Sequence, residues 1–189
     1  MFSKGILRRY FSNVTLKRDT NQAYELGKYA IEFLNNGKPS QKVIDRVKLF
    51  HTDSIVCGLS ALALKTNAPS VLKNEALTYG KKSSSSNPRP KLGYAKCFGS
   101  NELVVAEKAI VANCSAVREW DSNGTVFGYN SQIPGHQAGE FGHNDFYPVV
   151  IAAAQQNSAI NGLKAAKAMV LLDEIRGRLA EVFSLKTYK

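Results

Sequence analysis

The chain has 189 residues, of which 44% are hydrophobic, and its formal net charge is +10. This hydrophobic content lies in several long apolar-periodic segments, which excludes a disordered chain and indicates a packed globule. No apolar run is long enough to span a membrane, so we expect no membrane partner. Three cysteines without a CxxC pair exclude a disulfide framework and a zinc ribbon.

The first eighteen residues have the composition of a mitochondrial transit peptide. They hold five basic residues and no acidic residue, and Phe2, Ile6 and Tyr10 recur four apart, on one face of a helix. Without these five charges the balance of the chain falls from +10 to +5, which is unlike a polybasic nucleic-acid arm. We expect a presequence at 1–18, a chain at 19–189 in the mitochondrial matrix, and no nucleic-acid partner. The alternative is a frayed basic terminus.

Apolar residues recur at helical spacing through most of 19–189, and no strand-like alternation stands out. The sequence therefore predicts an all-α fold. In the long helix opened by Pro39 and Ser40, the stretch from Ile55 to Leu64 is almost wholly apolar, which predicts central burial. The other expected helices span 21–36, 67–79, 103–120, 148–156 and 161–183. The apolar side of 103–120 is formed by Val104, Ala109, Ala112 and Ala116, and the core face of 161–183 by Leu163, Ala166, Val170, Ile175, Leu179 and Val182. Residues 81–90 are polar and broken by proline, which predicts an exposed loop.

A polar run separates two of these helices. It holds a carboxylate at Asp121, a hydroxyl at Thr125 and imidazoles at His136 and His143, among several glycines. This layout is typical of a site loop held by a helical scaffold. The residues alone favour a turn at Asp121, because Asp-Ser-Asn-Gly is a strong turn signal. No third ligand accompanies the two histidines, so we expect no metal site. His51 is interpreted as a hydrogen-bonded core histidine.

The order of motifs around this run points to a known family. Ala112-Asn-Cys-Ser-Ala116 precedes Asp121, Thr125 follows four residues later, and Gly142-His143-Asn144-Asp145 leads into an apolar run. Together with Asp53-Ser-Ile-Val-Cys-Gly58, this order resembles the MmgE/PrpD family. Cys114 stands where the family usually has glycine, and Asn123 and Gly124 replace two frequent acidic residues.

The resemblance implies a cofactor-free dehydratase that removes water from the small tricarboxylate 2-methylcitrate in propionate catabolism. Such a reaction needs a base, an acid and cations for the carboxylates. By resemblance, Asp121, Thr125 and His143 line the catalytic site. His143 would act as acid or base, Asp121 would orient it, and Thr125 would bind a substrate carboxylate or hydroxyl. No cofactor and no metal is implied, and the full-length form is expected to be a homodimer.

The resemblance also implies that part of the site is missing from this chain. It covers the N-terminal portion of the family's large helical domain, without the α+β lid, and further His, Lys and Tyr site residues would follow residue 189. We therefore expect the isolated chain to be inactive and to expose apolar faces. Three other interpretations stay open: cis-aconitate decarboxylation, a non-catalytic helical mitochondrial interaction protein, and a basic RNA-associated protein. The last lacks an aromatic–basic binding motif.

Overall fold

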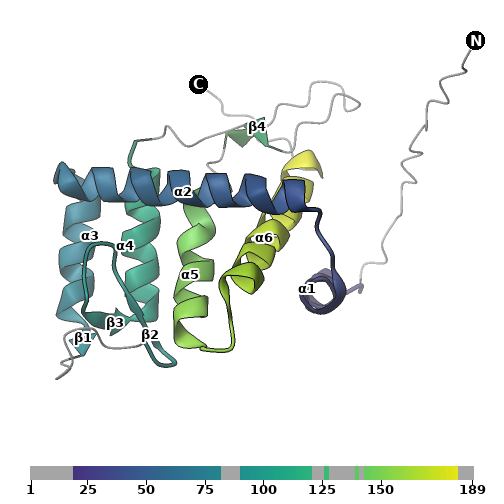
Figure 1. Cartoon of the computed structure of the whole chain (residues 1–189), viewed down its shortest axis with the longest axis horizontal. Coiled ribbons are helices and arrows are strands. Elements are labelled where there is room, and N and C mark those ends of the chain that lie inside the picture. Colours follow the sequence, from purple (N-terminus) through teal and green to yellow (C-terminus); the bar gives the residue numbers. More distant parts are fainter. Residues whose placement is uncertain (1–18, 82–89, 121–125, 128–138, 141–142, 183–189) are drawn as a thin grey trace, which may run out of the picture.

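The computed structural model describes residues 19–81, 90–120, 126–127, 139–140 and 143–182, and only the backbone of 126–127, 139–140, 143 and 182. This part is mainly helical, which confirms the predicted class at that level (Figure 1). The described residues also form a small three-stranded sheet and a two-stranded pair, which the all-α expectation did not include. The predicted presequence at 1–18 and nearly all of the predicted loop at 81–90 lie outside the described residues.

The helices form a row with one long helix across it. In Figure 1, α2 runs over the ends of α3, α4, α5 and α6, while α1 lies beyond α6 at the edge of the row. Neighbours in the row pack against each other, and α1 packs on α6. The helices are α1 (Gln22–Asn36), α2 (Gln41–Ala63), α3 (Asn67–Thr78), α4 (Ala106–Arg118), α5 (Tyr147–Gln156) and α6 (Gly162–Val182).

Local signals in the sequence set several helix ends. The Asn21 side chain accepts a hydrogen bond from the Tyr24 N–H at 3.0 Å, and α1 begins there. The Ser40 hydroxyl caps α2 in the same way. Pro148 lies in the first turn of α5, where the missing N–H costs nothing. These predicted starts are confirmed.

The small sheet is the largest departure from the predicted elements. Its strands are β1 (Gly80–Lys81), β3 (Leu103–Val105) and β2 (Tyr94–Lys96), antiparallel and in the order β1-β3-β2. The predicted helix over 103–120 is therefore wrong in its first turn. Leu103–Val105 carries two valines, which suit a strand, and both neighbouring strands bond to it.

The edge strand β2 and the preceding Gly93 are stabilised by amide side chains from the helices α4 and α5. Gln155 of α5 accepts a hydrogen bond from the Lys96 N–H at 3.0 Å, and Gln156 accepts one from the Gly93 N–H at 2.7 Å. Asn113 of α4, almost fully buried, donates to the Lys96 carbonyl at 3.0 Å. These bonds satisfy backbone groups that an edge strand would otherwise expose. Asn113-Cys-Ser115 matches the glycosylation sequon, but the Asn113 side chain is buried and serves this structural role.

The core lies on the inner side of α2 and around α4. The predicted core residues Val104, Ala109, Ala112 and Ala116 are fully or nearly fully buried. The predicted central burial of 55–64 is wrong, because only one side of this stretch faces the row. Its inner side presents Cys57, Gly58 and Ala61, which are buried. On its outer side Val56 is 60% exposed and Leu64 is 68% exposed.

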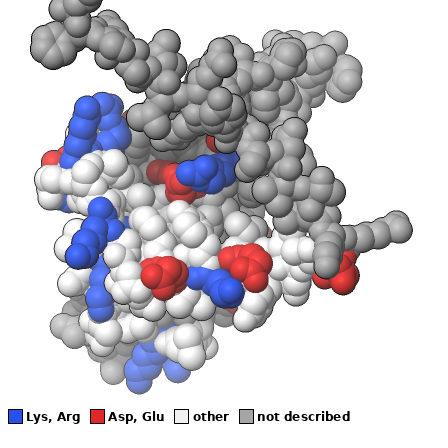
Figure 2. Space-filling view, turned by 90° about the vertical axis from the view of Figure 1, so that its right-hand side faces the viewer, with Lys and Arg blue, Asp and Glu red and all other residues white. Residues whose placement is uncertain are grey.

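Two predicted core positions of α6 are also wrong. Leu163 and Leu179 are exposed, whereas the buried residues of this helix include Ala165, Ala166 and Met169. Small residues allow α6 to approach its neighbours closely. On the α1 and α6 side of the molecule, several acidic side chains lie next to basic ones, other basic side chains stand alone, and much of the remaining described surface is uncharged (Figure 2). On α6, Arg178 forms an ion pair with Glu174 at 2.6 Å.

Candidate functional site

The polar run chosen from the sequence begins at the end of α4 and ends at α5. Its described parts are the strands β4 (Val126–Phe127) and β5 (Gly139–Glu140), which pair antiparallel, and a 3₁₀ turn, η1 (His143–Phe146). Asp121, Thr125 and His136 lie outside the described residues. His143 is described by its backbone alone and forms the first residue of η1. The proposed grouping of Asp121, Thr125 and His143 therefore stays a prediction.

The residue after His143 attaches η1 to the long helix. The Asn144 side chain is fully buried, and its amide donates to the Phe50 carbonyl at 3.0 Å and to Asp53 Oδ2 at 3.1 Å. The Ser54 hydroxyl donates to the Asn144 backbone carbonyl at 3.2 Å. Because each of these bonds ends on α2, the backbone beside His143 is held in a fixed position.

A second contact joins the two ends of the polar run. Arg118, in the last turn of α4, forms an ion pair with Asp145 at 3.6 Å. The Asp145 side chain is nearly buried, whereas that of Arg118 is about half exposed. Arg118 precedes Asp121 by three residues, and Asp145 follows His143 by two. Both ends of the run therefore start from one point of the scaffold, here called the anchor cluster: Asp53, Ser54, Arg118, Asn144 and Asp145.

A pair of groups from α5 and α6 lies next to the anchor cluster. The Tyr147 hydroxyl donates to Asp173 Oδ2 at 2.6 Å. Burial raises the pKa of Asp173 from 3.8 to about 6, against the opposing effects of this hydrogen bond and of Arg176. The Arg176 guanidinium lies 4.0 Å from the centre of the Phe146 ring, a cation–π contact with η1. The C-terminal half of α6 thus helps to hold the same turn.

The thiol at Cys114 lies near Asp145 without being suited to attack a substrate. Burial, and after it the negative charge of Asp145, raises the pKa of Cys114 to about 11. The thiol is therefore protonated near neutral pH, whereas a nucleophilic cysteine must be a thiolate. Among the described residues, no group of three or more His, Cys, Asp or Glu side chains is placed to hold a metal ion.

The prediction for His51 is only half right. The imidazole lies against the core, 6.2 Å from the Tyr147 ring between centroids, and burial lowers its pKa. Its Nδ1 atom, however, is buried without a hydrogen-bond partner among the described residues. The expected hydrogen-bonded core histidine is therefore core-facing but not satisfied at that atom.

The sequence does not predict that the residues of the anchor cluster contact one another. Asn144 and Asp145 directly follow His143, and Asp53 stands in the motif on α2 that the resemblance rests on. The one local signal is the polar pair Asn144-Asp145 directly before the apolar helix α5. Their partners are about ninety positions away on α2 and twenty-seven positions away on α4, a pairing that spacing along the chain does not reveal.

The fold and the site together define a mainly helical protein in which a partly buried polar cluster ties the residues on both sides of the polar run to α2 and α4. Comparisons of the chain with protein-family models, with curated proteins and with solved structures found no match. The resemblance seen in the sequence thus stays a prediction. In the described part of the chain, no single helix has the length and apolar character of a membrane span; α2 and α3 meet that criterion only when taken together, across an 89° bend.

Proposed function

We propose that this chain supplies the helical scaffold and three site residues of a cofactor-free hydro-lyase of the MmgE/PrpD type. Its substrate would be 2-methylcitrate, which loses water to give 2-methyl-cis-aconitate. The observation that carries the proposal is the anchor cluster, because the Arg118–Asp145 ion pair and buried Asn144 fix the chain on both sides of the polar run. A dehydration site needs such preorganisation for its acid and base.

The proposed roles follow from the chemistry of the reaction. Removal of water from a tertiary alcohol next to carboxylates needs a base for the carbon-bound proton and an acid for the departing hydroxyl. His143 is the proposed acid or base, Asp121 orients it, and Thr125 binds a carboxylate or hydroxyl of the substrate. Arg118, whose half-exposed guanidinium lies at the edge of the run, is a candidate cation for one carboxylate.

A turnover assay on the protein as it is isolated from mitochondria tests the proposal. Dehydration of 2-methylcitrate is followed by the ultraviolet absorbance of the new carbon–carbon double bond. We expect His143→Ala to lower kcat by about 10²–10⁴-fold, the usual contribution of a general acid or base. His136→Ala, in the same run, is the matched control and should retain most activity. Near-normal turnover by His143→Ala would remove this residue from the mechanism.

The length of the protein in the cell decides how this assay is interpreted. The mass of the endogenous protein is measured first, by immunoblot and mass spectrometry of isolated mitochondria. A species much larger than 189 residues is the form in which we expect activity. The 189-residue chain alone is expected to show no turnover, and robust dehydration by it would contradict the proposal that further site residues are needed. Activity on cis-aconitate, measured as release of CO₂, tests the neighbouring decarboxylase reaction.

A second function, that of a non-catalytic helical interaction protein, is favoured by one observation. The outer side of α2 carries Leu49 and Val56, which are 64% and 60% exposed, and α1 has no buried residue. Large exposed apolar side chains on adjacent helices are typical of protein-binding surfaces. Stoichiometric co-purification with one mitochondrial protein, together with absence of turnover, would favour this function over the first.

A further inference from the structure

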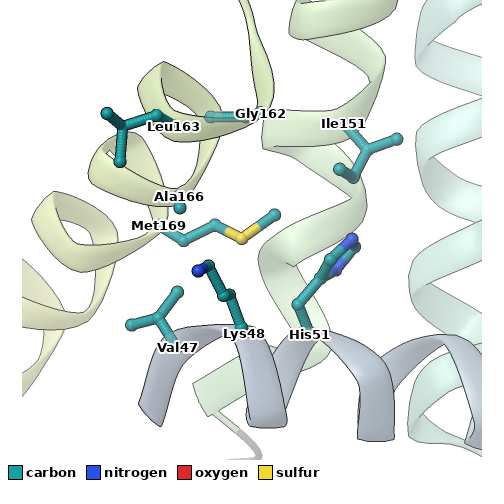
Figure 3. A pocket seen from close by; sticks show the side chains of 9 residues that line it. Val47, Lys48, His51, Ile151, Gly162, Leu163, Ala166 and Met169 are labelled. Atoms are coloured by element: carbon teal, nitrogen blue, oxygen red, sulfur yellow. The ribbon is translucent and has the colours of Figure 1, made fainter. Parts of the chain in front are cut away.

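A cavity lies between α2, α5 and α6, away from the polar run. It encloses about 400 Å³, within the range of small-molecule sites. None of its lining residues belongs to 118–145 (Figure 3). The lining residues are Val47, Lys48, His51, Ile151, Gly162, Leu163, Ala165, Ala166 and Met169.

The polar groups of the cavity come from one wall. Lys48 and His51 lie three residues apart on α2, so both side chains rise from the same side of the helix toward Met169 and Ile151 (Figure 3). The Lys48 ammonium also contacts Asp45 at 3.4 Å in an exposed ion pair, which a ligand anion would share or replace. Lys48 is the single cation among the nine lining residues, and none of the nine is acidic.

The His51 imidazole is the second polar group at the same wall. Its Nδ1 atom is buried and has no hydrogen-bond partner in the described part of the chain. Burial also lowers the pKa of His51, which favours the neutral ring near neutral pH. A neutral imidazole has one N–H donor and one acceptor nitrogen. Because Nδ1 has almost no solvent-accessible surface, the N–H that a ligand in the cavity would meet is the one on Nε2 of the neutral ring.

The remaining walls are apolar. Val47 of α2, Ile151 of α5 and Met169 of α6 enclose the space, and Leu163 stands at its rim, 65% exposed. Methionine adapts its shape to varied apolar ligands. A ligand that suits this cavity therefore has one anionic or hydrogen-bonding end and an apolar body.

We propose that this cavity binds a medium-chain monocarboxylate. The carboxylate lies against the Lys48 ammonium and the His51 N–H, and the alkyl chain runs along Val47, Ile151 and Met169. A single lysine balances a single carboxylate, so the cavity disfavours a tricarboxylate such as the proposed substrate of the polar run. The same lysine disfavours an amine, and the apolar walls disfavour a short hydrophilic acid.

Calorimetric titration of the 189-residue chain with octanoate tests this site. We expect saturable one-to-one binding with a Kd of roughly 0.1–1 mM, as suits a ligand of this size. Octylamine and 1-octanol, which keep the tail and change the head group, should bind at least about tenfold more weakly. Binding without saturation, or equal affinity for all three compounds, would overturn the proposal.

Variants of the chain separate the head-group and tail contacts. Lys48→Gln should weaken octanoate binding about tenfold and leave 1-octanol unchanged. Lys42→Gln, on the same helix but outside the cavity, is the matched control and should bind octanoate like the parent chain. Leu163→Ser should weaken octanoate and 1-octanol alike by several-fold, and it spares the fold because Leu163 is 65% exposed. Unchanged affinity in Lys48→Gln would exclude a carboxylate at this wall.

Discussion

At the scale of single residues, Asn144 attaches the C-terminal end of the polar run to the helix α2 by hydrogen bonds. It is fully buried and it bonds α2 through both its side chain and its backbone carbonyl. An aspartate or a leucine at this position would lose the amide donors while the Phe50 carbonyl and Asp53 stayed in place. The buried amide is the donor to both acceptors, so the side-chain type at this position is tightly constrained.

Asn144→Ala is expected to lower the free energy of unfolding by about 1–3 kcal/mol, because two acceptors on α2 lose their donor. Urea unfolding followed by circular dichroism measures this change. The control is Asn74→Ala, an exposed position on α3, for which we expect a change within about 0.5 kcal/mol. Equal losses in the two variants would argue against the anchoring role of Asn144.

Asp173 should make the stability of the protein depend on pH. The folded state raises its pKa from 3.8 to about 6, so the folded state holds this proton more tightly than the unfolded state does. The resulting stabilisation is complete below the unfolded pKa and is lost as the pH rises through about 6. His51, whose pKa is lowered by burial, acts in the opposite direction over the upper part of this range.

The measurement that isolates Asp173 compares the parent chain with Asp173→Asn, which keeps an acceptor for the Tyr147 hydroxyl. Between about pH 4.5 and about pH 7.5, the parent should lose about 1–3 kcal/mol more unfolding free energy than the variant. The contribution of His51 is common to both proteins and cancels. Parallel pH profiles would show that Asp173 does not titrate in this way.

At the scale of elements, the helix α2 shows that an almost wholly apolar helical run need not be buried on all sides. Its run from 55 to 64 is apolar all round, yet only the side with Gly58 and Ala61 packs against the row. The β3 strand gives the converse case, since Leu103–Val105 continues the helical apolar pattern of α4 but pairs with β1 and β2. Periodicity identified the core residues of α4 correctly but misplaced Leu163 and Leu179 of α6, because the side of a helix that is buried is decided by packing.

Gly58, on the inner side of α2, packs closely against the Phe98 ring. A Cβ atom at this position would lie 2.9 Å from two ring carbons of Phe98, so Gly58→Ala should lower the free energy of unfolding by about 1–3 kcal/mol. Gly27→Ala on α1 is the control, because nothing lies within 4 Å of its Cβ position. There alanine should stabilise the protein by about 0.5–1 kcal/mol through its better helix propensity. A stabilising Gly58→Ala would contradict the packing of Phe98 on α2.

At the scale of the whole molecule, the exposed apolar side chains of α1 and α2 should govern its behaviour in solution. Leu49 and Val56 lie seven residues apart on the outer side of α2, and Leu59 extends the same stripe. Large apolar side chains exposed on one side of a helix are typical of association surfaces. We therefore expect the purified chain to self-associate or to bind a partner through this side.

The double variant Leu49→Lys with Val56→Lys should reduce self-association without loss of helicity. Sedimentation velocity and binding of a hydrophobic dye measure the effect, and circular dichroism checks the fold. We expect a shift toward monomer and lower dye fluorescence than in the parent chain. The control pair, Asn74→Lys with Ser158→Lys, adds the same charge at exposed positions outside α1 and α2 and should leave association unchanged. Association that persists in the lysine variant would place the contact elsewhere.

The sequence by itself determined the mainly helical class, the starts of α1, α2 and α5, and the core positions of α4. These features depend on caps, prolines and periodicity, which act over a few neighbouring residues. It also singled out the polar run, although Asp121 and Thr125 lie outside the described residues and the side chain of His143 is not described. Only the tertiary structure decided that Leu103–Val105 is a strand and that Val56 and Leu64 are exposed.

The tertiary structure likewise decided the partners of Asn144 and Asp145 and the cavity beside Lys48 and His51. Each of these joins residues that are tens of positions apart in the sequence. No local pattern records such a pairing, because it depends on how whole helices pack. The physical division is therefore between short-range backbone preferences, which the chain carries in its sequence, and long-range contacts, which arise when its helices meet.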